Sequence, residues 1–363
     1  MMKLKLVFAL ILGIAFSFSA NAQTIEDRLD AIEEALSSDD GGSGSKTSLG
    51  GYGELHLNAG DDTADDKIDI HRFVIFIGHD YNDNVKFFSE FEIEHSIAGE
   101  GQPGEVEMEQ MYVDVNHGDG LHVKYGVFLI PVGILNETHE PPTFYGVERN
   151  GVEKNIIPTT WWEGGVMISK DLGDGLNFDF GVHSGMEIPT SGKVRSGRQK
   201  IGNAVSNNWA FTTRLKHSTP GLEMAFTYHN QTDAYQSKQA TELGATLMSA
   251  HVDWTTGPFG LRALMAEWDL SNNVLEAAGK GKQEGMYVRA AYKLNDKVGL
   301  FARYETYDVT AGDSTDSEVR IDTFGINYYI HPQVVLKADF QAESYANSAN
   351  DDDVFNLGFG FSY

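Results

Sequence analysis

Apolar and polar residues alternate along most of this chain, in short segments separated by clusters of Gly, Asp, Asn and Pro. Alternation places every second side chain on the same face, which is typical of a strand with one apolar and one polar face. We predict sixteen such strands. Their expected ranges are 48–59, 67–81, 85–97, 105–117, 121–132, 161–171, 176–186, 208–217, 222–232, 242–255, 259–270, 284–294, 298–309, 318–330, 334–345 and 354–363.

The connections between these segments alternate in length. Residues 81–84, 171–175 and 295–297 are typical of tight turns, whereas the connections between such turns are longer and polar. An even strand number with short turns at one end and long loops at the other is typical of bacterial outer-membrane barrels. We therefore predict an all-β fold, a sixteen-stranded antiparallel transmembrane β-barrel over residues 47–363, with its short turns in the periplasm.

The last strand carries a row of large apolar side chains. Phe355, Leu357, Phe359, Phe361 and Tyr363 share one face, and small or polar residues share the other. An exposed row of this kind at the end of a soluble sheet would promote aggregation, whereas lipid would cover it. Other aromatic residues expected to face lipid are Trp162, Phe178, Phe180, Phe211, Phe226, Tyr228, Tyr292, Tyr304, Phe324, Tyr328 and Phe340.

The N-terminus has the pattern of an export signal. Residues 1–22 combine a short basic start, an apolar stretch over 4–18 and the small-residue motif Ala20-Asn21-Ala22, which predicts a cleaved signal peptide. The chain contains no cysteine, so neither a lipoprotein anchor at the cleavage site nor a disulfide framework is expected.

Residues 23–46 form a predicted periplasmic helical segment followed by a Gly/Ser linker. Ile25, Leu29, Ile32 and Leu36 have the spacing of a short coiled-coil stripe. Fewer than two heptads are marginal as an isolated helix in water. Two interpretations stay open, namely a self-associating coiled coil and a surface-packed or frayed helix.

A family resemblance lies in the middle of the barrel sequence. Residues 125–133 (YGVFLIPVG), 148–150 (ERN) and 161–165 (WWEGG) resemble the fifth strand, long inward loop and sixth strand of the phosphate-selective porin O/P family. The resemblance implies a sixteen-stranded, usually trimeric channel in the Gram-negative outer membrane. Such a homotrimer needs no cofactor, has outer-membrane lipid and lipopolysaccharide as neighbours, and lets small hydrophilic solutes and ions diffuse passively.

Charge bears on selectivity. The chain has 27 Lys and Arg against 53 Asp and Glu, for a formal charge of -26. This balance disfavours nucleic-acid binding and repels anions at long range. Phosphate-selective members of the resembled family line their pore with an arginine stack and a lysine cluster, so anion (phosphate-like) or other charge-based selectivity is left open here.

Strand parity assigns the wall residues that point into the pore. The expected acidic lining residues are Glu54, Glu90, Glu92, Glu94, Asp114, Glu163 and Asp179. The expected basic lining residues are Lys124, Arg214, Lys216, Arg262, Arg289, Lys293, Arg303 and Lys337. Acidic residues predominate in the first seven strands, and the basic ones gather from the eighth onward. Opposed charges would create a transverse field across the pore; alternatively, they hydrate the lumen and pair with neighbours on the wall.

Residues 134–160 are the expected constriction loop. Pro141, Pro142 and Pro158 stiffen it, and its apolar residues, such as Phe144 and Ile156, need a surface to pack on. We favour the barrel interior over an adjacent protomer as that surface. The polar residues expected at the constriction are Glu137, His139, Glu140, Glu148, Arg149, Glu153 and Lys154.

The sequence carries no motif of catalysis. Neither a G-x-S-x-G elbow nor an H-E-x-x-H helix is present, and the cluster 136–140 is interpreted as polar lining. We expect no enzyme activity, no catalytic residue and no metal ligand. The acidic runs 61–66 and 350–353 are either solvated or bind divalent cations, although neither has EF-hand spacing.

A second function class stays open, an adhesin or receptor scaffold whose loops rather than lumen do the work. Liposome swelling with sugars or amino acids separates the two, because a filled barrel would admit neither.

Deleting residues 138–155 is expected to raise single-channel conductance in planar bilayers, because the constriction would be removed. An unchanged conductance would argue against an inward position of this loop.

Overall fold

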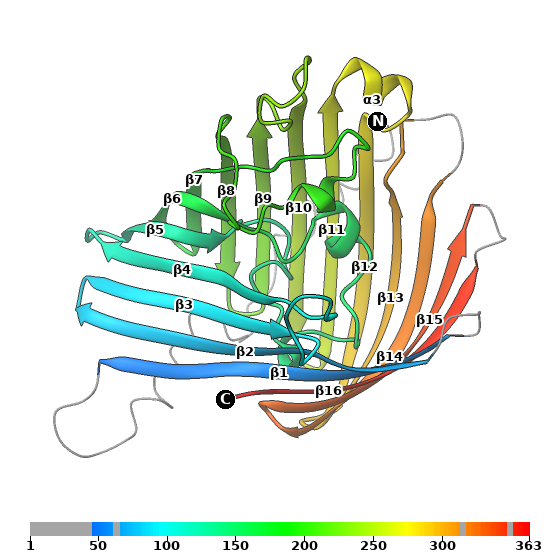
Figure 1. Cartoon of the computed structure of the whole chain (residues 1–363). Coiled ribbons are helices and arrows are strands. Elements are labelled where there is room, and N and C mark those ends of the chain that lie inside the picture. The colour runs from blue at the N-terminus through cyan, green and yellow to red at the C-terminus, as the bar shows by residue number, and fades with distance from the viewer. Residues whose placement is uncertain (1–45, 61–65, 313–316, 347–350) are drawn as a thin grey trace.

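The computed structural model describes residues 46–60, 66–312, 317–346 and 351–363. Within these ranges, sixteen strands form one closed antiparallel barrel (Figure 1). The strands are β1 Thr47–Gly60, β2 Lys67–Asn82, β3 Val85–Glu94, β4 Val106–Asn116, β5 Leu121–Leu129, β6 Trp162–Gly173, β7 Leu176–His183, β8 Ala210–Thr219, β9 Leu222–Gln231, β10 Gly244–Thr256, β11 Phe259–Ser271, β12 Lys282–Asn295, β13 Val298–Asp308, β14 Val319–His331, β15 Val334–Tyr345 and β16 Asp352–Ser362. The short helical segments are η1 Pro141–Thr143, η2 Val152–Ile156, η3 Val194–Gly197 and α3 Asn273–Ala277.

The predicted fold class is confirmed, and every predicted strand has an observed counterpart whose ends differ by three residues at most. β5 ends at Leu129 rather than residue 132, because Pro131 has no N–H to donate and the chain turns away from the wall. No helix in the described ranges is both long and apolar enough to cross a bilayer. The predicted signal peptide, nearly all of the predicted helical segment, residues 61–65 of the first acidic run and residue 350 of the second lie outside the described residues.

The barrel closes where the first strand meets the last. β1 pairs with β16 in antiparallel register, with Leu57 opposite Leu357. The backbone N–H groups of Gly51 and Tyr363 each donate to the other residue's carbonyl, at 2.9 Å. Closure removes the sheet edge, and in lipid that is required because no water is present to satisfy backbone groups.

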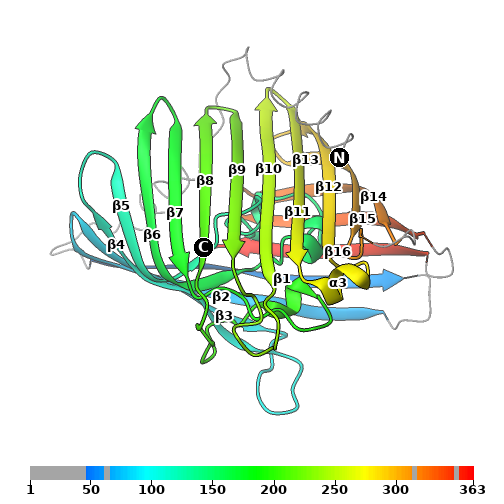
Figure 2. The same ribbon diagram turned by 90° about the horizontal axis from the view of Figure 1, so that it is seen from above.

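The two ends of the barrel differ as expected. Six of the seven connections at one end contain two residues each. At the other end, the longest connections are 130–161 and 184–209. Both belong to the interior and rim of the barrel, and residues 130–161 lie inside the ring of strands in both views (Figures 1 and 2).

Large apolar side chains cover the outer surface. Phe324, Phe340, Phe355 and Leu357 are 42–58% exposed, which lipid rather than water would accommodate. Trp162 is the exception among the expected lipid-facing aromatics. It is buried in a small cluster, because Val127, Leu129 and Ile201 pack around it.

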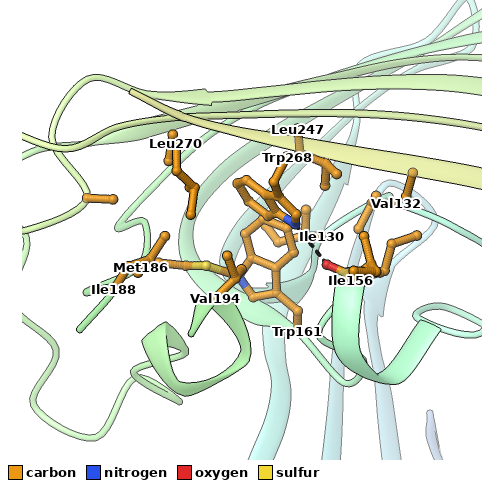
Figure 3. Packing of buried hydrophobic residues seen from close by; sticks show 14 of the residues in the cluster. Ile130, Val132, Ile156, Trp161, Met186, Ile188, Val194, Leu247, Trp268 and Leu270 are labelled. Atoms are coloured by element: carbon orange, nitrogen blue, oxygen red, sulfur yellow. Dashed lines mark hydrogen bonds between the residues drawn. The ribbon is translucent and has the colours of Figure 1, made fainter. Parts of the chain in front are cut away.

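One side of the barrel interior is apolar. Trp161 at the end of the inward loop and Trp268 of β11 lie at the centre of a buried cluster, with ring centroids 6.0 Å apart (Figure 3). Trp268 Nε1 donates to the carbonyl of Ile156 at 2.8 Å, which joins the wall to the loop. Loop residues such as Met186 complete the cluster. Part of the lumen is therefore a folded core.

Truncating Trp268 to Ala should destabilise the barrel by about 3–5 kcal/mol, because a fully buried indole is lost. Urea unfolding in lipid vesicles measures this loss. Phe259→Ala, at an exposed position on the same strand, is the matched control and should lower the free energy of unfolding clearly less. Equal costs would contradict a packed interior.

Candidate functional site

Residues 130–161, here called the inward loop, are fastened at both ends by one side chain. Asn136 Nδ2 donates to the carbonyls of Ile130 and Trp161, at 2.7 and 2.9 Å. Its Oδ1 accepts from the Trp161 N–H at 2.7 Å. The loop therefore leaves the wall and returns to it at one point, and everything between projects into the barrel.

Glu153 is the internal anchor of the inward loop. Its side chain is fully buried, and Oε1 accepts from the backbone N–H groups of Ile134 and Leu135 at 2.6 and 2.7 Å. Oε2 accepts from Asn150 Nδ2 at 3.0 Å and from the Tyr287 hydroxyl at 2.9 Å. A buried carboxylate is stable only when its oxygens are satisfied, and here four donors satisfy them.

The inward loop reaches the opposite wall. The Val147 N–H donates to Asp339 Oδ2 of β15 at 2.6 Å, and the Gly151 N–H donates to Glu305 Oε2 of β13 at 3.0 Å. Its apolar side chains, including Phe144, are buried inside the same barrel.

Glycine on the inner face of β16 makes room for this loop. A Cβ atom at Gly360 would lie 2.2 Å from Pro141 Cβ, and one at Gly358 would lie 3.1 Å from a methyl group of Val147. The terminal strand therefore has large apolar side chains on its outer face and glycines where its inner face meets the loop.

A cavity of about 250 Å³ lies between the inward loop, the first strands and the connection 184–209. Its charged and titratable lining residues are Glu54, His56, His71, Arg72, Glu94, His95, Glu107, Glu148, Arg149, Lys154, Arg195, Arg198 and Lys200.

Most carboxylates of this cavity are already compensated. Arg72 Nε lies 2.8 Å from Glu54 Oε1, and His56 Nδ1 lies 3.0 Å from Glu148 Oε1. Lys200 forms an ion pair with Glu107. The negative charge that these groups present to a passing solute is therefore reduced.

Four cations of the cavity have no such compensation. Among the described residues, Arg149, Lys154, Arg195 and Arg198 form no ion pair. Arg195 Nη1 donates to the carbonyls of Lys154 and Thr159, at 2.8 and 2.7 Å. Neutral carbonyls hold a guanidinium in place without cancelling its charge.

These arginines also disfavour one another's charge. Burial lowers the pKa of Arg195, and the nearby guanidiniums of Arg198 and Arg149 lower it further. Burial likewise lowers the pKa of Arg149, whose Nη2 has no hydrogen-bond partner in the described ranges. A bound anion would relieve this repulsion, because opposite charge stabilises the protonated form.

Five of the seven expected acidic lining residues lie either at the cavity or in the buried interior. Glu54 and Glu94 line the cavity. Glu90, Glu92 and Glu163 are at most 2% exposed, and loop residues contact two of them, His139 at Glu90 and Ser184 at Glu163. The alternation of side chains along a strand correctly predicts that these three point inward. It does not predict that they are buried from water.

Asp114 and Asp179 lie away from the cavity. Asp114 Oδ2 is 3.2 Å from His122 Nδ1, and Asp179 Oδ2 is 2.8 Å from Arg214 Nη2.

The expected basic lining residues are largely paired on the wall. Arg262 Nε donates to Asp253 Oδ2 at 2.9 Å, and Arg303 Nη2 lies 3.5 Å from Glu305 Oε1. The other contacts are Arg289 with Asp253 at 3.7 Å, Lys216 with Glu223 at 3.9 Å, Lys337 Nζ donating to the Gly146 carbonyl at 2.7 Å, and Lys124 over the Tyr112 ring at 4.6 Å. Lys293 is exposed. Local pairing weakens the case for a transverse field from these residues.

The charged residues expected on the constriction loop also lie in different places, some at the cavity and some away from it. Glu148, Arg149 and Lys154 line the cavity. Glu137 pairs with Arg214, and Glu140 lies beside η1, where its carbonyl accepts from the Thr143 N–H at 2.9 Å.

His139 is buried against the wall and is 3% exposed. Its ring contacts Glu90 of β3 and Glu109 of β4.

Arg195, Arg198 and Lys200 were not among the predicted lining residues, because they belong to the connection 184–209 rather than to a strand. The run 193–200, KVRSGRQK, has four basic residues in an acidic chain, and that local excess was the available signal.

A closed sixteen-stranded antiparallel barrel with an apolar outer surface is the fold of an outer-membrane channel. The family model of the Gram-negative porins matches residues 8–353, so the chain belongs to that family. An uncharacterized protein of Aquifex aeolicus (strain VF5) is 34% identical over 339 residues, covering 84% of this chain and 77% of that protein.

Three solved structures share the fold at low identity. An anion-selective porin from Comamonas acidovorans has a TM-score of 0.63 at 12% identity, covering 88% of this chain and all of that one. OmpF of Salmonella typhi, in complex with daunomycin, has a TM-score of 0.62 at 15% identity, with 88% and 98% covered. OmpT of Vibrio cholerae, in a trimer form, has a TM-score of 0.58 at 13% identity, with 87% and 99% covered.

Replacing Glu153 by Leu should loosen the inward loop, because two buried N–H groups lose their acceptor at about 1–3 kcal/mol each. Limited proteolysis of the folded protein should cut within 130–161 faster. Glu140→Leu, in the same loop, is the control and should leave the cleavage rate unchanged. Resistance of the Glu153 variant would show that this carboxylate does not anchor the loop.

Proposed function

We propose that the protein is a porin through which small hydrophilic solutes diffuse passively, with a preference for anions. The observation that carries this proposal is the group of four unpaired cations in the cavity, Arg149, Lys154, Arg195 and Arg198. Two loops supply them, the inward loop and the connection 184–209, and both bring their charge to the same cavity.

The net charge of -26 does not oppose this preference at short range. Exposed charges are screened beyond about 8 Å at physiological ionic strength, whereas partly buried charges in a cavity are screened much less. An ion that has entered the cavity therefore experiences the guanidinium groups more than the acidic outer loops.

The expected solutes are small carboxylates and phosphate-like anions. A guanidinium donates two parallel hydrogen bonds to either group. This chemistry supports a relationship to the phosphate-selective porin O/P family without favouring phosphate over a carboxylate.

We also infer a homotrimer in the outer membrane, formed after removal of residues 1–22, without catalysis. The trimer form of the structurally similar OmpT supports the assembly. An adhesin with a closed lumen remains the alternative, and it predicts no swelling of protein-containing liposomes in small sugars or amino acids.

The reversal potential of the wild-type protein under a salt gradient should indicate anion preference. Arg149→Gln, Arg195→Gln and Arg198→Gln combined should shift it toward cations, since three unpaired charges are removed.

The matched control is Lys67→Gln, Lys193→Gln and Lys297→Gln combined, which removes the same charge at exposed positions. This variant should keep the wild-type reversal potential. An equal shift in both variants would mean that overall charge, not the cavity, sets selectivity.

A further inference from the structure

The inward loop inserts a histidine between two carboxylates of the wall. His139 meets Glu90 of β3 and Glu109 of β4, and the three residues are 3%, 2% and 1% exposed. The cluster is separate from the cavity described above, whose lining includes none of the three.

The distances in this cluster are those between ligands of a metal ion. His139 Nε2 lies 3.4 Å from Glu109 Oε2 and 3.6 Å from Glu90 Oε1. Two ligands on a tetrahedral ion with bonds of about 2.1 Å are about 3.4 Å apart. Within the described part of the chain, neither His139 ring nitrogen nor Glu109 Oε2 has a hydrogen-bond partner. Buried polar atoms seldom lack a hydrogen bond, and the ion-pair contacts between His139 and the two carboxylates do not supply one, so these atoms indicate a missing ligand.

Neighbouring side chains orient both carboxylates. Gln110 Nε2 donates to Glu90 Oε2 at 2.7 Å, and Thr160 Oγ1 donates to Glu109 Oε1 at 2.6 Å. In each carboxylate one oxygen is held, and the other is directed at His139. Outer hydrogen bonds of this kind fix the ligands of metal sites.

The local charge balance also favours a cation. Glu92 is a third buried carboxylate beside this cluster, and Arg72 Nη1 is 3.5 Å from it. Arg72 Nε is also 2.8 Å from Glu54 Oε1, and in the described ranges His139 is the only cationic side chain that forms an ion pair with Glu90 or Glu109. Buried charge of this kind is costly unless it is paired or coordinates a metal.

We propose that Glu90, Glu109 and His139 bind one divalent transition-metal ion of the Zn²⁺ type. One imidazole and two carboxylates suit Zn²⁺ or Mn²⁺, whereas Ca²⁺ takes six to eight oxygen ligands. The ion joins the inward loop to β3 and β4 and thereby fixes the loop opposite its Glu153 anchor. It acts as a structural clamp, separate from solute passage.

Direct metal binding tests the site. The full chain, purified with chelator in detergent and then given Zn²⁺ alone, should retain about one ion per chain and gain thermal stability. Glu109→Gln and His139→Gln should each weaken Zn²⁺ binding more than tenfold. Asp114→Asn and His122→Gln, a histidine–carboxylate pair on β4 and β5, are matched controls and should bind as the wild type does.

Co²⁺ binding to the wild-type protein tests the site even if the substituted variants fail to fold. Co²⁺ should give the visible absorption of a four- or five-coordinate ion, and Zn²⁺ should displace it. Absence of this absorption, or equal Zn²⁺ retention by the wild type and folded Glu109→Gln, would overturn the proposal.

Discussion

The structure depends on one constraint, that a backbone crossing lipid must satisfy all of its hydrogen bonds within the sheet. The pairing of β1 with β16, completed by the bonds between Gly51 and Tyr363, meets this constraint by closing the sheet. Closure in turn fixes which side chains face lipid and which face the interior. The aromatic row of β16 lies outside, and the glycines of the same strand lie inside, where the inward loop needs space.

A closed sixteen-stranded barrel encloses more space than its wall side chains occupy, and the inward loop fills much of it. Trp161 and Ile156 of the loop pack on Trp268, which makes one side of the interior a dry core. Glu153 connects the loop backbone to β12 through Tyr287. Strands and loops both line the described cavity, and its four cations without an ion pair in the described ranges come from loops. On the proposed function we therefore expect loops more than strands to set selectivity.

The strands were predictable because alternation and turn residues are local properties, and an inward or outward position follows from parity alone. The environment of an inward residue was not predictable, because it depends on contacts between distant segments. Glu163 is inward yet buried, whereas Arg195, which no strand pattern includes, lines the cavity. The apolar inner faces of β10 and β11, with Leu247 and Leu264, were a sequence signal that something packs on them.

We expect the interior to be divided into a dry core and a cationic water path. Because the chain contains no cysteine, single introduced cysteines report accessibility without background. Reaction with a membrane-impermeant thiol reagent, followed as loss of channel current, is the most direct test. Glu148→Cys and Arg195→Cys should react quickly, and Leu247→Cys and Leu264→Cys should stay unmodified. Equal reaction at all four positions would show a lumen that is wet throughout and would contradict this division.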